Sequence, residues 1–176
     1  MKYAAFLRGV NVGGHALVKM TDLKALLERA GFADVQTVIA SGNVIFDARS
    51  GDDQSIERKI EATLKKKYKR DVAVMVRSID ELRAMERSQP FKGIKVDKNT
   101  RLYVTFLSDK SLGVKLPELP KDLRIVRIRE KDVFAVLEIS PRMKTTDSMN
   151  IIAKLFGSRI TTRNWNTVQR ILKMAK

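Results

Sequence analysis

Apolar and polar positions in residues 1–77 alternate between the period of a strand and the period of a helix. Short apolar runs at residues 3–7, 35–40, 43–48 and 72–76 predict four strands. Two amphipathic helices are predicted between these strands, because apolar residues recur there at spacings of three and four. Their apolar faces are formed by Leu23, Leu26, Leu27 and Ala30 in the first helix and by Ile56, Ile60, Leu64 and Tyr68 in the second.

The predicted ends of these helices rest on capping chemistry. Thr21 is the expected N-cap of the first helix, with Asp22 in its first turn. Gly31 is expected to end that helix, with Phe32 folding back on Leu27 as in a Schellman motif. The second helix is expected to begin after residues 51–53, where acidic side chains favour a helix N-terminus.

The predicted order βαββαβ is typical of the ferredoxin-like split βαβ arrangement. In that arrangement the first strand lies between the third and the fourth, and the first and second strands run in the same direction. The loop at residues 8–14, the turn at residues 41–43, the start of the first helix and the end of the second would then meet at one end of the sheet. The topology therefore predicts a common site there.

The second half of the chain has a less regular pattern. Ser78 and Glu81 form a capping box that predicts a short helix ending before Pro90. Further strands are predicted at residues 101–107, 123–129 and 133–139, and further helices at 149–156 and around Trp165. We expect an α+β fold with a ferredoxin-like βαββαβ half at residues 1–77. A second, smaller α/β half at residues 78–176 is expected to pack against it in one compact unit.

Charge is the strongest compositional signal. The chain of 176 residues carries 35 Lys and Arg against 20 Asp and Glu, a net charge of +15. The excess is uneven, with +4 in residues 1–88 and +11 in residues 89–176. Such a surface attracts polyanions. The same excess also fits a protein that is merely basic, because no arginine-rich tail concentrates the charge.

Several kinds of chemistry are excluded or disfavoured by composition. The chain has no cysteine, so disulfides, thiol catalysis and thiolate metal sites are absent. His15 is the only histidine and has no second imidazole with which to bind a metal. We therefore expect no metal and no cofactor. No apolar run is long enough for a membrane span or a signal peptide, which favours a cytoplasmic protein without a membrane partner.

The loop at residues 8–14 is the best candidate site. Its glycines, Gly13 and Gly14 among them, could turn backbone N–H groups inward as an anion nest, beside the side chains of Arg8 and Asn11. The spacing matches neither the dinucleotide-binding pattern nor the P-loop pattern. A turn that needs the positive φ of glycine is the favoured alternative. His15 is a weak candidate for proton transfer, and a surface or capping role is favoured for it.

Each of the other candidate residues has a possible ligand-binding role and a possible structural role. Ser41 and Asn43 belong to the turn, where turn formation is the simpler role for Ser41. Lys66, Lys67 and Arg70 lie at or beyond the end of the second predicted helix, where the helix dipole already favours cations. Near the C-terminus, the polar segment at residues 161–168 predicts a helix start capped by Thr162 or Asn164, and Trp165 is expected in the core. The remaining ligand-binding candidates there are Arg163, Asn164 and Asn166.

Three segments together resemble the bacterial domain-of-unknown-function family 1697. They are LRGVNVGG at residues 7–14, SGNVIF at residues 41–46 and TTRNWNTV at residues 161–168. The segments occur in the order of the family and span almost the whole chain. The resemblance implies a compact α+β protein with ferredoxin-like character. It implies no assigned activity, cofactor or catalytic residue.

We expect binding of an anionic partner, nucleic acid or a phosphorylated small molecule, by a monomer or weak dimer. RNA-recognition domains share the topology, but residues 43–48 lack their basic-Gly-aromatic pattern, so an exposed base-stacking sheet is not expected. One alternative is a small enzyme that acts on an anionic metabolite, with Arg8 and Asn11 as clamps. Another is a structural or partner-binding protein. Whether the chain is an enzyme stays open, with binding favoured over catalysis.

Overall fold

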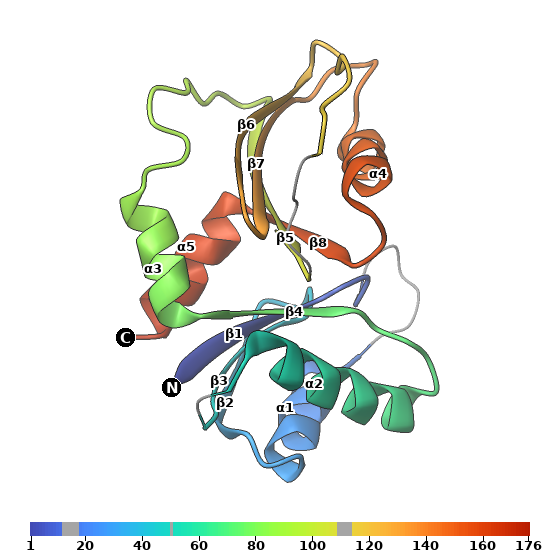
Figure 1. Cartoon of the computed structure of the whole chain (residues 1–176), viewed down its shortest axis with the longest axis vertical. Coiled ribbons are helices and arrows are strands. Elements are labelled where there is room, and N and C mark those ends of the chain that lie inside the picture. Colours follow the sequence, from blue (N-terminus) through green and yellow to red (C-terminus); the bar gives the residue numbers. More distant parts are fainter. Residues whose placement is uncertain (12–17, 50, 109–113) are drawn as a thin grey trace. The chain divides into compact units, whose positions relative to one another are not determined.

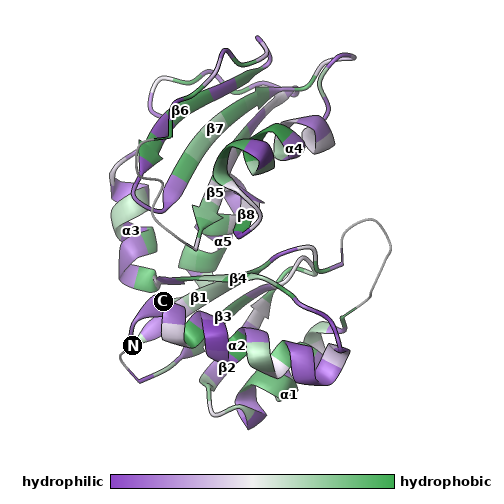
Figure 2. Ribbon diagram, turned by 45° about the vertical axis from the view of Figure 1, so that its right-hand side comes forward, coloured by the Kyte–Doolittle hydropathy of each residue, from purple (hydrophilic) through white to green (hydrophobic). Residues whose placement is uncertain are grey.

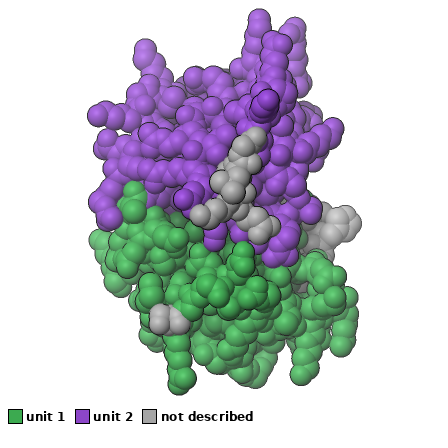
Figure 3. All heavy atoms as spheres, in the orientation of Figure 1, with its two compact units in different colours: residues 1–84, 169–176 green, residues 85–168 purple. Residues whose placement is uncertain are grey.

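The computed structural model describes residues 1–11, 18–49, 51–108 and 114–176. The fold is α+β, and the described residues form two four-stranded antiparallel sheets and five helices (Figure 1). The chain divides into two compact units, coloured separately in Figure 3. Unit 1 combines Met1–Ala84 with Gln169–Lys176, and unit 2 is Met85–Val168.

Unit 1 is built on the sheet of β1 (Lys2–Leu7), β2 (Ala33–Val38), β3 (Asn43–Asp47) and β4 (Val74–Ser78). The strand order is β2-β3-β1-β4, with each neighbouring pair antiparallel. The predicted position of β1 between β3 and β4 is therefore confirmed, as is the common direction of β1 and β2. This arrangement is compatible with a ferredoxin-like half.

Two helices cover one face of this sheet, α1 (Met20–Arg29) and α2 (Asp53–Tyr68). The Schellman motif after α1 is confirmed, because the Gly31 N–H donates to the Glu28 carbonyl and the Phe32 N–H to the Leu27 carbonyl. The expected N-cap at Thr21 is wrong, because α1 begins at Met20 and Lys19 precedes it without a side-chain cap. Asp52 caps α2 by accepting the Ser55 N–H at 2.7 Å.

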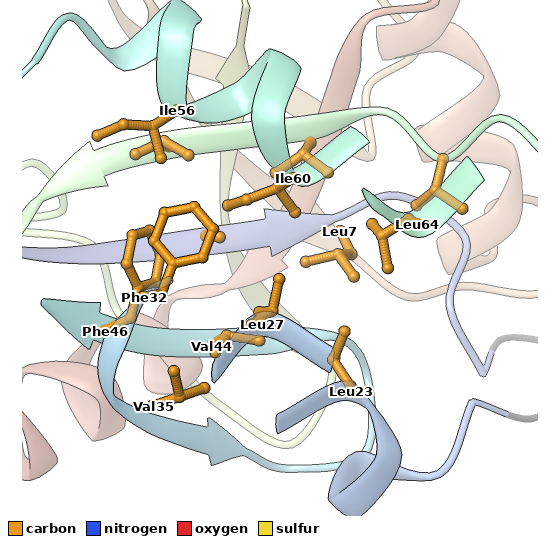
Figure 4. Close-up of a cluster of buried hydrophobic side chains, with 14 of the residues drawn as sticks. Leu7, Leu23, Leu27, Phe32, Val35, Val44, Phe46, Ile56, Ile60 and Leu64 are labelled. Atoms are coloured by element: carbon orange, nitrogen blue, oxygen red, sulfur yellow. The ribbon is translucent and has the colours of Figure 1, made fainter. Parts of the chain in front are cut away.

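The core of unit 1 lies between the helices and the sheet (Figure 4). Ile56, Ile60 and Leu64 point from α2 toward the strands, as their helical spacing predicts. Figure 2 shows the matching alternation of hydrophobic and hydrophilic residues along α2. The other face of the sheet is buried as well, since Ala4, Phe6 and Ile45 have no exposed surface. The core in Figure 4 is completed by side chains from the strands, from α1 and from the connection between α1 and β2: Leu7, Val35, Val44 and Phe46, then Leu23 and Leu27, then Phe32.

Helix α3 (Ile79–Arg87) follows β4 directly. The predicted capping box is confirmed, because the Glu81 N–H donates to Ser78 Oγ at 3.1 Å and the Ser78 N–H to Glu81 Oε2 at 2.7 Å. The first residues of α3 and the last residues of α5 (Trp165–Met174) belong to unit 1. The Arg83 guanidinium donates to the Ala175 carbonyl at 3.4 Å, which links α3 to the C-terminal segment of unit 1.

Unit 2 is built on the sheet of β5 (Thr100–Leu107), β6 (Leu123–Arg129), β7 (Asp132–Glu138) and β8 (Ile160–Asn164), in the order β6-β7-β5-β8. The strands predicted at residues 123–129 and 133–139 are confirmed as β6 and β7, which pair as an antiparallel hairpin. Helix α4 (Thr145–Phe156) begins four residues before the predicted start at Met149, because the Asp147 carboxylate accepts the Lys144 N–H and secures a polar first turn. Strand β8 is not predicted from the sequence, where its consecutive polar side chains indicate a helix start instead.

The buried position expected for Trp165 is confirmed, with 7% of its surface exposed. Its ring makes edge contacts with Phe91 and Phe134 at centroid distances of 5.5 and 6.4 Å. The expected division at residue 77 differs from the observed units, because residues 78–84 and 169–176 belong to unit 1. Among the described helices, none has the length and apolar character that a membrane span requires.

Candidate anion-binding site

Two main-chain hydrogen bonds join three distant segments at one end of the unit 1 sheet. The Leu7 N–H donates to the Gly42 carbonyl and the Arg8 N–H to the Ala73 carbonyl, each at 2.8 Å. The end of β1, the β2–β3 turn and the segment after α2 therefore meet, as the topology predicts. We call the group of Arg8, Gly9, Asn11, Ser41, Gly42, Asn43 and Arg70 the sheet-end site. The N–H groups of residues 7 and 8 already donate to carbonyl oxygens, so an anion nest cannot use them.

The Asn11 side chain holds the loop after β1 in place. Its Nδ2 donates to the carbonyls of Val18 at 2.9 Å and Ala40 at 2.7 Å, and its Oδ1 accepts the Val18 N–H at 2.7 Å. Asn11 also has a φ of +55°, a conformation that asparagine tolerates better than most residues. Both amide protons are thus engaged by the main chain. This residue positions the loop, and its expected ligand contact is confined to the remaining lone pair of Oδ1.

The turn contributes a buried amide and a close backbone approach. Asn43 is fully buried, and its Nδ2 donates to the Val38 carbonyl and to Ser41 Oγ, each at 3.1 Å. Gly42 has a φ of +75°, and a Cβ added there would lie 3.0 Å from Val10 Cβ. Asn43 therefore supports the turn from beneath, whereas Ser41 lies partly exposed at its surface.

Positive charge at this end comes from Arg8, which is exposed, and from Arg70, which is partly buried. Within the described residues, the Tyr68 hydroxyl and the Arg70 Nη2 are buried and have no hydrogen-bond partner. Burial raises the pKa of Tyr68, and the negative charge of Asp22 raises it further, while the Arg70 guanidinium opposes the shift. The Tyr68 hydroxyl therefore stays protonated at neutral pH. Sequence reasoning missed Tyr68, because its helical spacing marks it only as a core residue.

Lys66 and Lys67 lie in the last turn of α2, and their side chains are exposed. Together with Arg29 they line a cavity between α1 and α2. The structure therefore groups these two lysines with α1. Their expected contribution to the sheet-end site stays a prediction.

The three C-terminal candidates belong to unit 2. Arg163 donates to Thr161 Oγ1 at 2.7 Å and to the Thr162 carbonyl at 2.9 Å, and burial lowers the pKa of its guanidinium to about 10, so that it remains charged at neutral pH. Asn164 Oδ1 accepts the Asn166 N–H at 2.9 Å and thereby caps α5. The Asn166 side chain is exposed.

Gly13, Gly14 and His15 lie outside the described residues, so their predicted roles are not addressed by the structure. Across the part of the chain that is described, no group of three or more acidic or histidine side chains could hold a metal ion. The described candidates for ligand contact at the sheet end are thus Arg8, Ser41 and Arg70. Asn11 and Asn43 hold these segments together.

No curated protein matches this chain. It is similar in structure to a solved protein, the conserved bacterial protein SP0830 from Streptococcus pneumoniae, with a TM-score of 0.74 and 24% sequence identity over 99% of this chain and 98% of that one. At this identity the likeness shows the fold. Residues 1–134 match the model of a family described as proteins of unknown function, DUF1697, and the chain therefore belongs to the DUF1697 family.

Proposed function

We propose that this protein binds a phosphate-bearing anion, either nucleic acid or a phosphorylated small molecule, at the sheet-end site. The observation that carries the proposal is the meeting of the β1 loop, the β2–β3 turn and the segment after α2 through the 2.8 Å bonds of Leu7 and Arg8. This meeting sets Arg8 and Arg70 on loops held by a rigid sheet, where binding residues commonly lie. We expect the protein to act in the cytoplasm, as a monomer or weak dimer without a cofactor.

The proposed contacts are few and of defined chemistry. Arg8 supplies an exposed guanidinium, which can bind two phosphate oxygens at once. Arg70 supplies a buried nitrogen without a hydrogen-bond partner, and the nearby Tyr68 supplies a protonated hydroxyl, so both can donate to an anion. A buried donor without a partner costs free energy, which a bound phosphate oxygen would recover. Asn11 and Asn43 keep the loops in register and are not the main contacts.

Fluorescence anisotropy with labelled single-stranded RNA, single-stranded DNA and duplex DNA, measured across a salt series, tests the proposal. A log–log salt slope of about −0.7 to −0.9 per neutralised phosphate is expected if phosphates carry the contact. Arg8→Gln should reduce that slope by about 1. Arg49→Gln is the matched control, because Arg49 is also exposed but follows β3 at the opposite end of the sheet.

A second assay separates the two sources of phosphate. Thermal shift with inorganic phosphate and with mononucleotides should raise the Tm of the native chain but not that of Arg8→Gln if the ligand is small. A preference for one polymer that persists at about 0.15 M salt favours nucleic acid instead. Three results together would show that the proposal is wrong. The three polymers would bind weakly and equally, Arg8→Gln and Arg49→Gln would have the same salt slope, and no phosphate compound would raise the Tm.

A further inference from the structure

A cavity on unit 1 has a composition unlike that of the sheet-end site. It has a volume of about 470 Å³ and lies between α1 and α2, which are neighbours in Figures 1 and 2. This volume is in the range of small-molecule pockets. The lining residues are Leu26, Arg29, Ala30, Thr63, Lys66 and Lys67, which we call the helix groove.

The charge of the helix groove is entirely positive. Arg29, Lys66 and Lys67 are exposed, and within the described residues none of them forms an ion pair with a carboxylate. Neighbouring cations on the same helices do form such pairs: Lys24 with Glu28 at 3.8 Å, and Lys65 with Asp71 at 3.0 Å. Helix dipoles explain cations in a last turn, but they do not explain why three uncompensated cations line one cavity.

The base of the helix groove is apolar. Leu26 and Ala30 are only partly buried, although both pack against the core of unit 1. Thr63 adds no free donor, because its hydroxyl donates to the Lys59 carbonyl at 2.7 Å. An incoming ligand therefore meets apolar surface and three cations, with no carboxylate among the lining residues.

We infer that the helix groove binds an amphipathic anion, a single carboxylate or phosphate carried on a short alkyl chain. The headgroup pairs with Arg29, Lys66 and Lys67, and the chain covers Leu26 and Ala30. A bare anion would leave the apolar base in water, and a neutral alkyl compound would leave the cations unpaired. The inference is independent of the sheet-end site, because the two sites use different cations.

Methyl-resolved NMR titration of the full chain tests this inference. The probes are octanoate and octyl phosphate, used below the concentrations at which they form micelles. Acetate and inorganic phosphate lack the alkyl chain, and octyl glucoside lacks the charge. We expect saturable shifts of the Leu26 and Ala30 methyl resonances with octanoate, octyl phosphate or both, and weaker effects with the other three compounds. The stronger of the two alkyl anions identifies the preferred headgroup.

Variants assign the contacts. Arg29→Ala and Lys67→Ala should each raise the Kd up to about fivefold, as expected for an exposed ion pair. Lys24→Ala and Lys65→Ala are matched controls on the same two helices and should leave the Kd unchanged, as should Arg8→Gln at the sheet end. Thermal unfolding of every variant verifies that the fold is retained.

Three results would overturn the inference. One is the absence of saturable shifts at Leu26 and Ala30 with both alkyl anions. Another is an equal response to octyl glucoside, which would indicate nonspecific apolar contact. The third is an unchanged Kd in the triple variant of Arg29, Lys66 and Lys67 to alanine. None of these results bears on phosphate binding at the sheet end, because Arg8 and Arg70 are intact in the triple variant.

Discussion

Gly42 lies where the β2–β3 turn meets the end of β1. Its φ of +75° is costly for any residue with a Cβ, and that atom would lie 3.0 Å from Val10 Cβ and 3.1 Å from Leu7 Cβ. Gly42→Ala should therefore lower the free energy of unfolding by more than about 2 kcal/mol, through strain and overlap together. Urea denaturation of the two proteins measures the difference.

Gly9→Ala separates these two causes. Gly9 has a φ of +66°, but a Cβ there would have no atom within 4 Å, so only the conformational strain remains. Its expected cost is about 1 kcal/mol. Equal losses in the two variants would show that the contacts with Leu7 and Val10 do not restrict residue 42.

Asn11 acts through three side-chain hydrogen bonds to the main chain. Asn11→Ala should lower the free energy of unfolding by about 2 kcal/mol, because Val18 and Ala40 lose their partners in a partly exposed position. Asn11→Asp should be worse, since its carboxylate cannot donate and would face two carbonyl oxygens. Denaturant unfolding at neutral pH checks this order. An Asn11→Asp variant with an unchanged free energy of unfolding would contradict the assigned hydrogen bonds.

At the scale of elements, the N-terminus of α2 predicts a pH dependence. The Ser55 N–H and the Ser55 hydroxyl both donate hydrogen bonds to the Asp52 carboxylate. These bonds, the N–H bond most of all, lower the pKa of the Asp52 carboxyl below its ordinary value of 3.8. A carboxyl with a lowered folded-state pKa contributes stability above its unfolded pKa and loses it as the pH falls through the folded pKa. Asp52→Ala should therefore lower the Tm at neutral pH, and the difference from the native chain should shrink below about pH 4. A difference in Tm that stays constant down to pH 2 would argue against this capping role.

Helix α2 also protects the edge strand β4. Glu57 Oε1 accepts the Val76 N–H at 2.9 Å, and Glu61 Oε1 accepts the Val74 N–H at 3.0 Å, so two outward N–H groups of that strand are paired. Glu57 is 1% exposed. Glu57→Ala should cost about 1–3 kcal/mol, because it leaves a buried N–H without an acceptor.

Two further variants make this prediction specific. Glu57→Gln keeps an oxygen acceptor and should be milder than Glu57→Ala, and Glu61→Ala should cost less because its bond is only partly buried. Urea denaturation ranks the three variants. An unchanged stability of Glu57→Ala would show that the edge N–H needs no side-chain partner.

At the scale of the whole molecule, unit 1 is assembled from both ends of the chain. Ile171 lies in its C-terminal segment and is fully buried. Ile171→Ala should cost about 2–5 kcal/mol. Hydrogen exchange should show a larger loss of protection for the amides of β1 than for those of β7 in unit 2, and the reverse order would contradict the grouping of residue 171 with unit 1.

The elements of unit 1 were predictable because local and global signals agree there. The spacing of Ile56, Ile60 and Leu64 specifies one helix face, and the Gly31–Phe32 pair specifies a helix end. The local signals fail at β8, where a run of polar residues is interpreted as the start of a helix although it forms a strand. Strand β8 carries two consecutive threonines and pairs with β5, where Thr105 Oγ1 and Thr162 Oγ1 are 2.7 Å apart. No local pattern contains that pairing.

The candidate site divides in the same way. Arg8, Ser41 and Asn43 were grouped correctly from strand order alone, because strand directions determine which loops share an end of a sheet. The sequence did not indicate which of the candidate residues hold the loops in place and which can contact a ligand. The side chains of Asn11 and Asn43 donate hydrogen bonds to carbonyl oxygens of other segments. Lys66 and Lys67 line a cavity with Arg29, which lies on another helix.

Periodicity, capping and turn chemistry act between residues a few positions apart, so the sequence alone determines the helices, most of the strands and the family of this protein. Its composition also determines a large positive charge and the absence of cysteine chemistry. Hydrogen-bond partners and cavities depend on residues far apart in the chain. Only the tertiary structure therefore reveals that Asn11 is a positioning residue and that carboxylates of α2 cover the edge of β4. It also reveals that Arg29, Lys66 and Lys67, which form no ion pair within the described residues, line one cavity with apolar side chains.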